Sequence, residues 1–194
     1  NIAEVDIAPS VYDRFYKEPL ETVIFLDKLG EGVSAMVEFR YGSIIINPLG
    51  PNLAPNPSNN DKWLLRSSGE EKKILDLFHR FGFSTAEESF VQPDEESYYL
   101  FLKQGLPELQ ALAALYYADN LKLHVRAPGK VSATVRISQS DMLELSLEHH
   151  DMSVQELLTL LQSYRLKKRY HRLKDGSFIM LDNTEFETVA TLID

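Results

Sequence analysis

The chain has 194 residues, of which 44% are hydrophobic and none is cysteine, and its 29 Asp and Glu against 20 Lys and Arg give a net charge of −9. This composition is typical of a packed soluble domain and excludes a disordered chain, a disulfide framework, a thiolate nucleophile and a Cys-ligated metal site. No stretch approaches the roughly 18 consecutive apolar residues of a membrane span, so we expect a cytoplasmic protein with no membrane partner.

The first third of the chain is predicted to form a short helix and then a β-meander. Pro9 suits the first turn of a helix. Thr22–Leu26 is β-branched and aromatic, Val33–Phe39 alternates with period two, and Ile44–Ile46 follows a turn at Tyr41–Ser43. The antiparallel pairing of these runs is the expected start of the fold.

A loop rich in proline and asparagine follows, from Pro48 to Asp61. It cannot sustain a helix or a strand ladder. If it separates two lobes, they are a β-rich lobe, residues 1–60, and an α+β lobe, residues 61–194. The chain also begins without Met and ends within an unfinished apolar pattern, so we expect a piece of a longer polypeptide.

The middle of the chain is predicted to hold a short strand and two helices. The strand is Lys62–Leu65. Ser68 and Glu71 form a capping-box pattern, which opens a helix that stops at Gly82. The second helix, roughly Asp94–Lys103, is expected to close at Gly105–Pro107.

The last third of the chain is predicted to form two hairpins, each followed by a helix. Residues 131–147 alternate on both sides of a short polar turn, and Asp175-Gly176 marks a second hairpin. Ser153 and Thr184 each stand three residues before a glutamate and open the two helices. Hairpins with interspersed helices predict an α+β fold whose sheet is mostly antiparallel.

No motif in the sequence indicates a catalytic, metal or cofactor site. Gly129-Lys130 lacks the rest of a phosphate-binding loop. The acidic run at Asp94–Ser97 suits a helix N-terminus better than a magnesium box. His149 and His150 are adjacent, so on a strand they would point to opposite faces and could not share an ion. Paired carboxylates stay open, because 29 acids offer many pairs.

Six basic residues lie within ten positions of an otherwise acidic chain: Arg165, Lys167, Lys168, Arg169, Arg172 and Lys174. Such a segment favours contact with phosphate or nucleic acid, with Tyr164 and Tyr170 as candidate stacking partners. Alternatively, cations near a helix C-terminus complement its dipole, and a solvated basic face can pair with acids elsewhere. A net charge of −9 opposes long-range attraction to DNA, so both interpretations stay open.

Several blocks of residues resemble those of a known family, in the same order. They are Phe39–Gly42 with Asn47-Pro48, then Gly105–Leu109, and finally Tyr164-Arg165, Lys167-Lys168 and Tyr170–Phe178. These blocks are similar to the bacterial helicase-associated domain that precedes the motor in SWI/SNF-type ATPases. In that family the ATP site, the acidic magnesium box and the arginine finger belong to two RecA-like lobes downstream.

The resemblance implies a non-catalytic accessory region of a DNA-dependent, helicase-like ATPase, with no catalytic residue, metal or cofactor of its own. The implied partners are the motor lobes of the same polypeptide, duplex DNA and other proteins, and the implied role is to tune the coupling of ATP hydrolysis to translocation. Two alternatives remain: a protein-binding module that meets an acidic partner and no nucleic acid, and a hydrolase with two carboxylates converging in a deep cleft.

Overall fold

The computed structural model describes residues 14–51, 62–119, 121, 125–126, 131–137, 143–149 and 152–181. The chain divides into two compact units, Asn1–Leu121, called unit 1, and Lys122–Asp194, called unit 2. The predicted lobe boundary at residues 60 and 61 falls where residues 52–61 are outside the described ranges, and it stays a prediction. The helix predicted after Thr184 is also outside them.

Unit 1 is built on a six-stranded sheet in the order β6-β7-β3-β2-β8, with β4 paired to β3. The strands are β2 (Leu20–Leu29), β3 (Gly32–Tyr41), β4 (Ile44–Ile46), β6 (Ser84–Ala86), β7 (Ser89–Gln92) and β8 (Ala114–Tyr117). Every pair is antiparallel except β2 with β8, which run parallel. The predicted meander of the first third is therefore confirmed.

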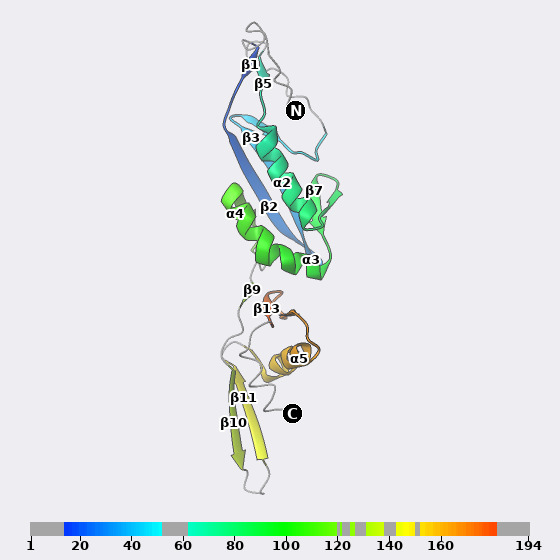
Figure 1. The fold of residues 1–194 in the computed structure, drawn as a ribbon, viewed down its shortest axis with the longest axis vertical. Coiled ribbons are helices and arrows are strands. Elements are labelled where there is room, and N and C mark those ends of the chain that lie inside the picture. The colour runs from blue at the N-terminus through cyan, green and yellow to red at the C-terminus, as the bar shows by residue number, and fades with distance from the viewer. Residues whose placement is uncertain are drawn as a thin grey trace, which may run out of the picture. The chain divides into compact units, whose positions relative to one another are not determined.

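One face of this sheet is covered by helices. They are α2 (Ser68–Arg80), α3 (Glu95–Leu100), the π-helical turn η1 (Phe101–Gly105) and α4 (Leu106–Leu112). In the view of Figure 1, α2 and α4 run in nearly the same direction as the long strand β2. Because side chains alternate along a strand, Ile24, Val37 and Phe39 share one face, and each is at most 1% exposed. This face carries the core of unit 1.

Two predictions at helix ends in unit 1 are wrong. The N-cap of α2 is Ser67, and no side chain caps it; the Glu71 side chain bonds to Arg66 and Tyr41 instead of forming a capping box. The second helix does not close at Gly105–Pro107. The chain continues through η1 into α4, because Pro107 lies in the first turn of α4, where its missing N–H is not needed.

The helix predicted after Pro9 is also wrong where it can be compared. Phe15 and Tyr16 form strand β1, which pairs in parallel with β5 (Trp63–Leu64). The predicted strand at Lys62–Leu65 is confirmed by β5. None of the helices in the described ranges is long and apolar enough to cross a membrane.

Unit 2 consists of a long hairpin, one helix and a three-stranded sheet. The hairpin pairs β10 (Val131–Ile137) with β11 (Leu143–His149), as predicted. Helix α5 (Val154–Arg165) begins at the predicted cap, where the Ser153 hydroxyl accepts from the Glu156 N–H at 3.2 Å. The sheet has the order β12-β13-β9, with β12 (Tyr170–Arg172), β13 (Phe178–Met180) and β9 (Val125–Arg126).

The described core of unit 2 joins α5 to the β12–β13 hairpin. It consists of Leu157, Leu160, Leu161, Leu173, Ile179 and Leu181, with Met152 and Tyr164 packed against it. Leu157 and Leu160 are fully buried. The hairpin predicted at Asp175-Gly176 is confirmed, and Gly176 takes a φ of +87° in its loop. The overall class, α+β with a mostly antiparallel sheet, is confirmed as well.

Candidate functional site

The predicted basic residues lie at the end of α5 and along the segment that leads through β12. Arg165 is in the last turn of α5, Lys167, Lys168 and Arg169 form the turn into β12, and Lys174 lies in the hairpin loop. These five side chains are exposed, and Arg172 on β12 is half-buried. We call Arg165–Arg169 the basic turn. The wider run from Arg165 to Lys174, which includes β12 and the start of the β12–β13 loop, is called the basic segment.

The basic turn is a Schellman motif. The Lys168 N–H donates to the Ser163 carbonyl at 3.1 Å, and the Lys167 N–H donates to the Tyr164 carbonyl at 2.8 Å. This geometry places Lys167 in the left-handed region with φ +54°. Glycine is usual in this conformation, and an L-amino acid there lowers stability by about 1 kcal/mol.

Helix α2 ends in the same motif with the usual residues. The Phe83 N–H donates to the Phe78 carbonyl and the Gly82 N–H to the His79 carbonyl, both at 3.0 Å. Gly82 takes the left-handed position with φ +70°, and the Phe78 and Phe83 rings make the apolar contact typical of the motif. At the end of α5, lysine replaces both of these favourable residues.

The two tyrosines predicted as stacking partners make packing contacts within unit 2. Tyr164 is half-buried and packs against the core of unit 2. The Tyr170 ring meets the Phe178 ring edge-on, with centroids 5.4 Å apart. The Arg172 guanidinium lies 5.2 Å from the centroid of the same Phe178 ring, so this cation also helps to hold the hairpin.

The carboxylates near the basic residues already accept hydrogen bonds. Residues 152–181 contain six Lys and Arg and only two acids, Glu156 and Asp175. Glu156 Oε1 accepts from the Lys174 N–H at 3.2 Å, and Asp175 Oδ1 accepts from the Ser177 N–H at 2.9 Å and its hydroxyl at 2.6 Å. The local charge is therefore positive.

Charge differs sharply between the two units. Residues 1–121 hold 19 Asp and Glu against ten Lys and Arg, whereas residues 122–194 hold ten of each. The whole net charge of −9 therefore belongs to unit 1, and unit 2 is neutral overall with a basic segment. The net charge of the chain is a poor guide to what unit 2 binds.

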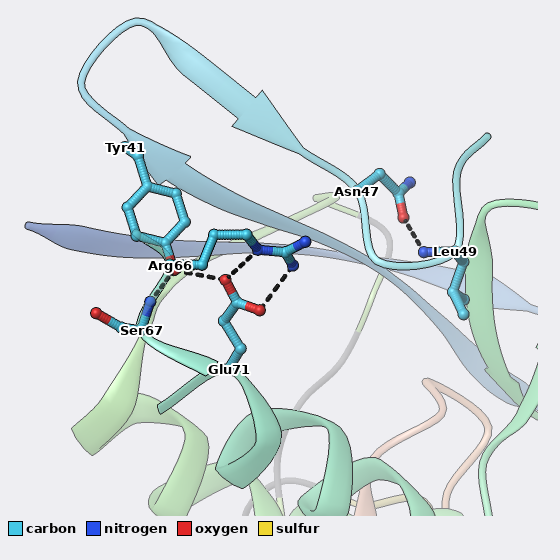
Figure 2. A network of polar contacts seen from close by, with 6 residues as sticks. All are labelled: Tyr41, Asn47, Leu49, Arg66, Ser67 and Glu71. Carbon is cyan, nitrogen blue, oxygen red and sulfur yellow. Dashed lines mark hydrogen bonds and ion pairs between the residues drawn. The ribbon is translucent and has the colours of Figure 1, made fainter. Parts of the chain in front are cut away.

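A polar network in unit 1 joins β3 to the start of α2 (Figure 2). The Tyr41 hydroxyl donates to Glu71 Oε1 and accepts from the Ser67 N–H at 2.9 Å. Arg66 reaches both Glu71 oxygens, with Nε at 2.9 Å and Nη2 at 2.7 Å. Burial, followed by the hydrogen bond to Glu71, raises the pKa of Tyr41 above its ordinary value, while the Ser67 N–H opposes this.

The raised pKa of Tyr41 predicts a stability loss at alkaline pH. The unfolded chain ionises Tyr41 near pH 10 while the folded chain keeps it neutral, so stability present below about pH 10 is lost as the pH rises toward the folded value. Wild type should therefore lose up to about 1.4 kcal/mol per pH unit relative to Tyr41→Phe. Urea unfolding followed by circular dichroism at about pH 8 and about pH 10.5 measures this. Exposed Tyr117→Phe should follow wild type, and equal losses in both variants would contradict the prediction.

Two further sets of contacts in unit 1 hold the loop at Asn47 and allow close packing at the end of η1. The Asn47 side chain donates to the Glu88 carbonyl and accepts from the Leu49 N–H, each at 2.9 Å; Figure 2 shows the second bond. Gly105 lies against the ring of Phe81, since a Cβ on it would stand 2.7 Å from Phe81 Cε2. A larger residue at 105 would push this ring away.

A pocket of about 370 Å³ lies where α2 ends beside α3 and α4. Its lining includes Arg80, Phe81, Leu100, Gln104 and Glu108. Glu108 is the one carboxylate in this lining, and it is paired with Arg80. Hydrolysis by paired carboxylates requires a second acid, so this pocket does not support that alternative.

Neither acids nor histidines form a metal cluster in the described ranges, where no group of three His, Cys, Asp or Glu could hold an ion. His149 ends β11, and the other two members of the His-His-Asp run are outside those ranges. Asp94 caps α3 by accepting from the Ser97 N–H at 2.8 Å, a bond that lowers the pKa of Asp94. The helix N-terminus predicted there is confirmed.

Comparison with known families accounts for the whole chain. The family model described as "Bacterial SNF2 helicase associated" matches residues 1–194. The chain belongs to this family. No curated protein and no solved structure matches the chain.

Within this SNF2 helicase-associated chain, the blocks that carry the resemblance have structural roles. Tyr41 anchors α2, Asn47 holds its loop to Glu88, and Gly105 lets Phe81 pack. In the last block, Tyr170 and Arg172 pack on Phe178. The exposed Lys167 and Lys168 differ, because the described contacts give their side chains no part in the fold. The sequence had no signal for the strain at Lys167, since a Schellman motif is recognised in sequence by its glycine.

Proposed function

We propose that this chain is a non-catalytic, cytoplasmic accessory domain of a bacterial SWI/SNF-type, DNA-dependent ATPase, and that it positions or regulates the motor through contacts with DNA or protein. The family description supports the association with a helicase. The sequence contains no phosphate-binding loop, so ATP and Mg²⁺ are bound by the motor lobes and this chain needs no cofactor.

The observation that carries this proposal is the exposed basic segment of unit 2. Arg165, Lys167, Lys168, Arg169 and Lys174 are all exposed and lie within ten residues. A concentrated set of cations on a neutral unit is the electrostatic footprint of a surface that binds anions. Duplex DNA and an acidic surface of a partner protein both present anionic groups to such a segment.

Neutralising these five cations in the full-length protein should impair the motor's response to DNA. The variant is R165Q/K167N/K168Q/R169Q/K174Q, in which asparagine keeps the left-handed backbone at position 167. We expect DNA-stimulated ATPase activity to fall, and the slope of log affinity against log salt to decrease by about 0.9 for each phosphate that the variant no longer neutralises. Steady-state ATPase assays and duplex titrations at several salt concentrations measure both quantities.

The matched control neutralises three exposed lysines of unit 1, K62Q/K72Q/K73Q. It should leave ATPase stimulation unchanged. If the basic-segment variant also keeps wild-type stimulation and affinity, the proposed function is wrong for this surface.

A protein partner is the second candidate, and one residue favours it. Leu166 stands between Arg165 and Lys167 and is 72% exposed, an apolar group that a protein surface can cover. Leu166→Ala should weaken a protein contact and lower ATPase stimulation while leaving the affinity for duplex DNA unchanged. A Leu166→Ala variant with wild-type ATPase stimulation would contradict this candidate.

A further inference from the structure

Lys167 occupies a strained backbone position that closes α5, and its side chain has no described role in that cap. Its φ of +54° is one that glycine adopts freely and other residues rarely adopt. Its side chain is exposed, and within the described ranges it makes no hydrogen bond or ion pair that would offset the strain. Glycine would close the helix without this strain, so the presence of lysine points to a role for the side chain itself.

The same chain shows the unstrained solution at another helix end. Helix α2 closes with Gly82 in the left-handed position and Phe83 packed back on Phe78. Helix α5 closes with Lys167 and Lys168 at these two positions. Compared with Gly82 and Phe83, these two lysines make the helix end less stable and add two positive charges to the same turn.

The charge of this turn suits phosphate groups. Arg165, Lys167, Lys168 and Arg169 are exposed and follow one another with only Leu166 between them. The C-terminal end of the α5 dipole is negative and lowers the mutual repulsion of these cations. Residues 152–181 hold six Lys and Arg against two acids, so the segment carries a net positive charge.

The aromatic side chains of the segment do not provide a stacking platform. Binding of single strands uses exposed rings on which successive bases stack. Tyr164 instead packs on the core of unit 2, and the Tyr170 ring lies edge-on to Phe178. What remains exposed is charge, which contacts the nucleic-acid backbone and reads no bases.

We propose that the basic turn, Arg165–Arg169, binds the phosphate backbone of double-stranded DNA without sequence preference, and that Lys167 is one of its phosphate-contacting residues. This inference rests on the proposed function and names the partner of that same surface. Lys167 closes α5 with its side chain exposed, and the exposed Arg165, Lys168 and Arg169 extend the contact.

Lys167→Gly tests this in the full-length protein, because it removes the charge and relieves the strain together. We expect the unfolding midpoint of unit 2 to rise by about 2–4 °C. Affinity for a 30-base-pair duplex should fall about eightfold at 0.1 M salt, and the salt slope should fall by about 0.9, the value of one phosphate contact. Lys167→Arg should keep wild-type affinity and slope. A single-stranded 30-mer should show no comparable loss.

Glu87→Gly is the matched control. Glu87 also has a left-handed backbone, with φ +51°, and is exposed in the turn between β6 and β7. This substitution relieves the same strain and removes no cation, so duplex binding should stay at the wild-type level.

Four outcomes would overturn the inference. If the Lys167→Gly protein is more stable and its duplex binding is unchanged, the lysine is only tolerated at this position and does not contact DNA. An equal loss on the single strand would remove the duplex preference. If duplex binding is unchanged but the five-cation variant still lowers ATPase stimulation, the basic turn contacts protein: the inference fails and the proposed function stands. If that variant also has no effect, both fail.

Discussion

Phe78→Ala is expected to lower the free energy of unfolding of unit 1 by about 3–5 kcal/mol, the largest effect we predict. Phe78 is fully buried and lies at the centre of an aromatic cluster. Its ring stacks on Phe90 at 4.7 Å, meets Phe83 edge-on at 5.0 Å and lies 6.5 Å from Phe101. The substitution removes these contacts and leaves a cavity between α2, β7 and η1.

Urea unfolding of the full chain measures this loss through the fluorescence of Trp63. This is the single tryptophan of the chain and lies in unit 1, so it reports unit 1 alone. Phe15→Ala is the matched control, because Phe15 is 38% exposed and should lose far less. A loss below about 1 kcal/mol for Phe78→Ala would contradict this packing of the aromatic cluster.

Glu71→Ala is expected to cost about 3 kcal/mol, the second largest effect. Glu71 is 6% exposed and is the shared acceptor of Arg66 and Tyr41. Without it the guanidinium loses a bidentate partner and the buried hydroxyl loses its acceptor, while Ser67 still donates to that hydroxyl. Arg66 remains partly exposed, so water replaces some of the loss and keeps the cost below that of a fully buried pair.

The control for Glu71→Ala is its exposed neighbour, Glu70→Ala, in the same first turn of α2. Both variants remove one acid from the positive end of the helix dipole, so their difference isolates the network with Arg66 and Tyr41. Glu71→Gln keeps an acceptor for Tyr41 and should lose less than alanine. Equal stabilities for the Glu70 and Glu71 alanine variants would show that the network contributes nothing.

Local sequence patterns predicted the turns, strands and helix ends that depend on neighbouring residues. The Asp175-Gly176 loop, the strand alternation of β3 and the α2 stop at Gly82 depend on neighbouring residues, because turn conformation, pleating and helix capping act over a few positions. The capping box expected at Ser68 and Glu71 failed because Glu71 has a stronger use across the fold, in its ion pair with Arg66.

Long-range packing decided the elements that local patterns did not predict. Gly105 and Pro107 are typical of a helix end, yet the chain continues from η1 into α4 because Gly105 fits against Phe81 and Pro107 needs no N–H partner. Strand β8 was missed because its pairing with β2, from Val23 with Ala114 to Leu26 with Tyr117, joins segments far apart in sequence.

The sequence by itself determined the charge of the basic segment, the α+β class and the family blocks, since residue identity and short-range periodicity carry this information. Only the tertiary structure decided how the segment presents its charge. Tyr164 packs on the unit 2 core and Tyr170 packs edge-on to Phe178, while the α5 cap holds Lys167 in a left-handed conformation with its side chain exposed. Burial and backbone geometry depend on contacts between segments distant in sequence, and such contacts are invisible in a local pattern.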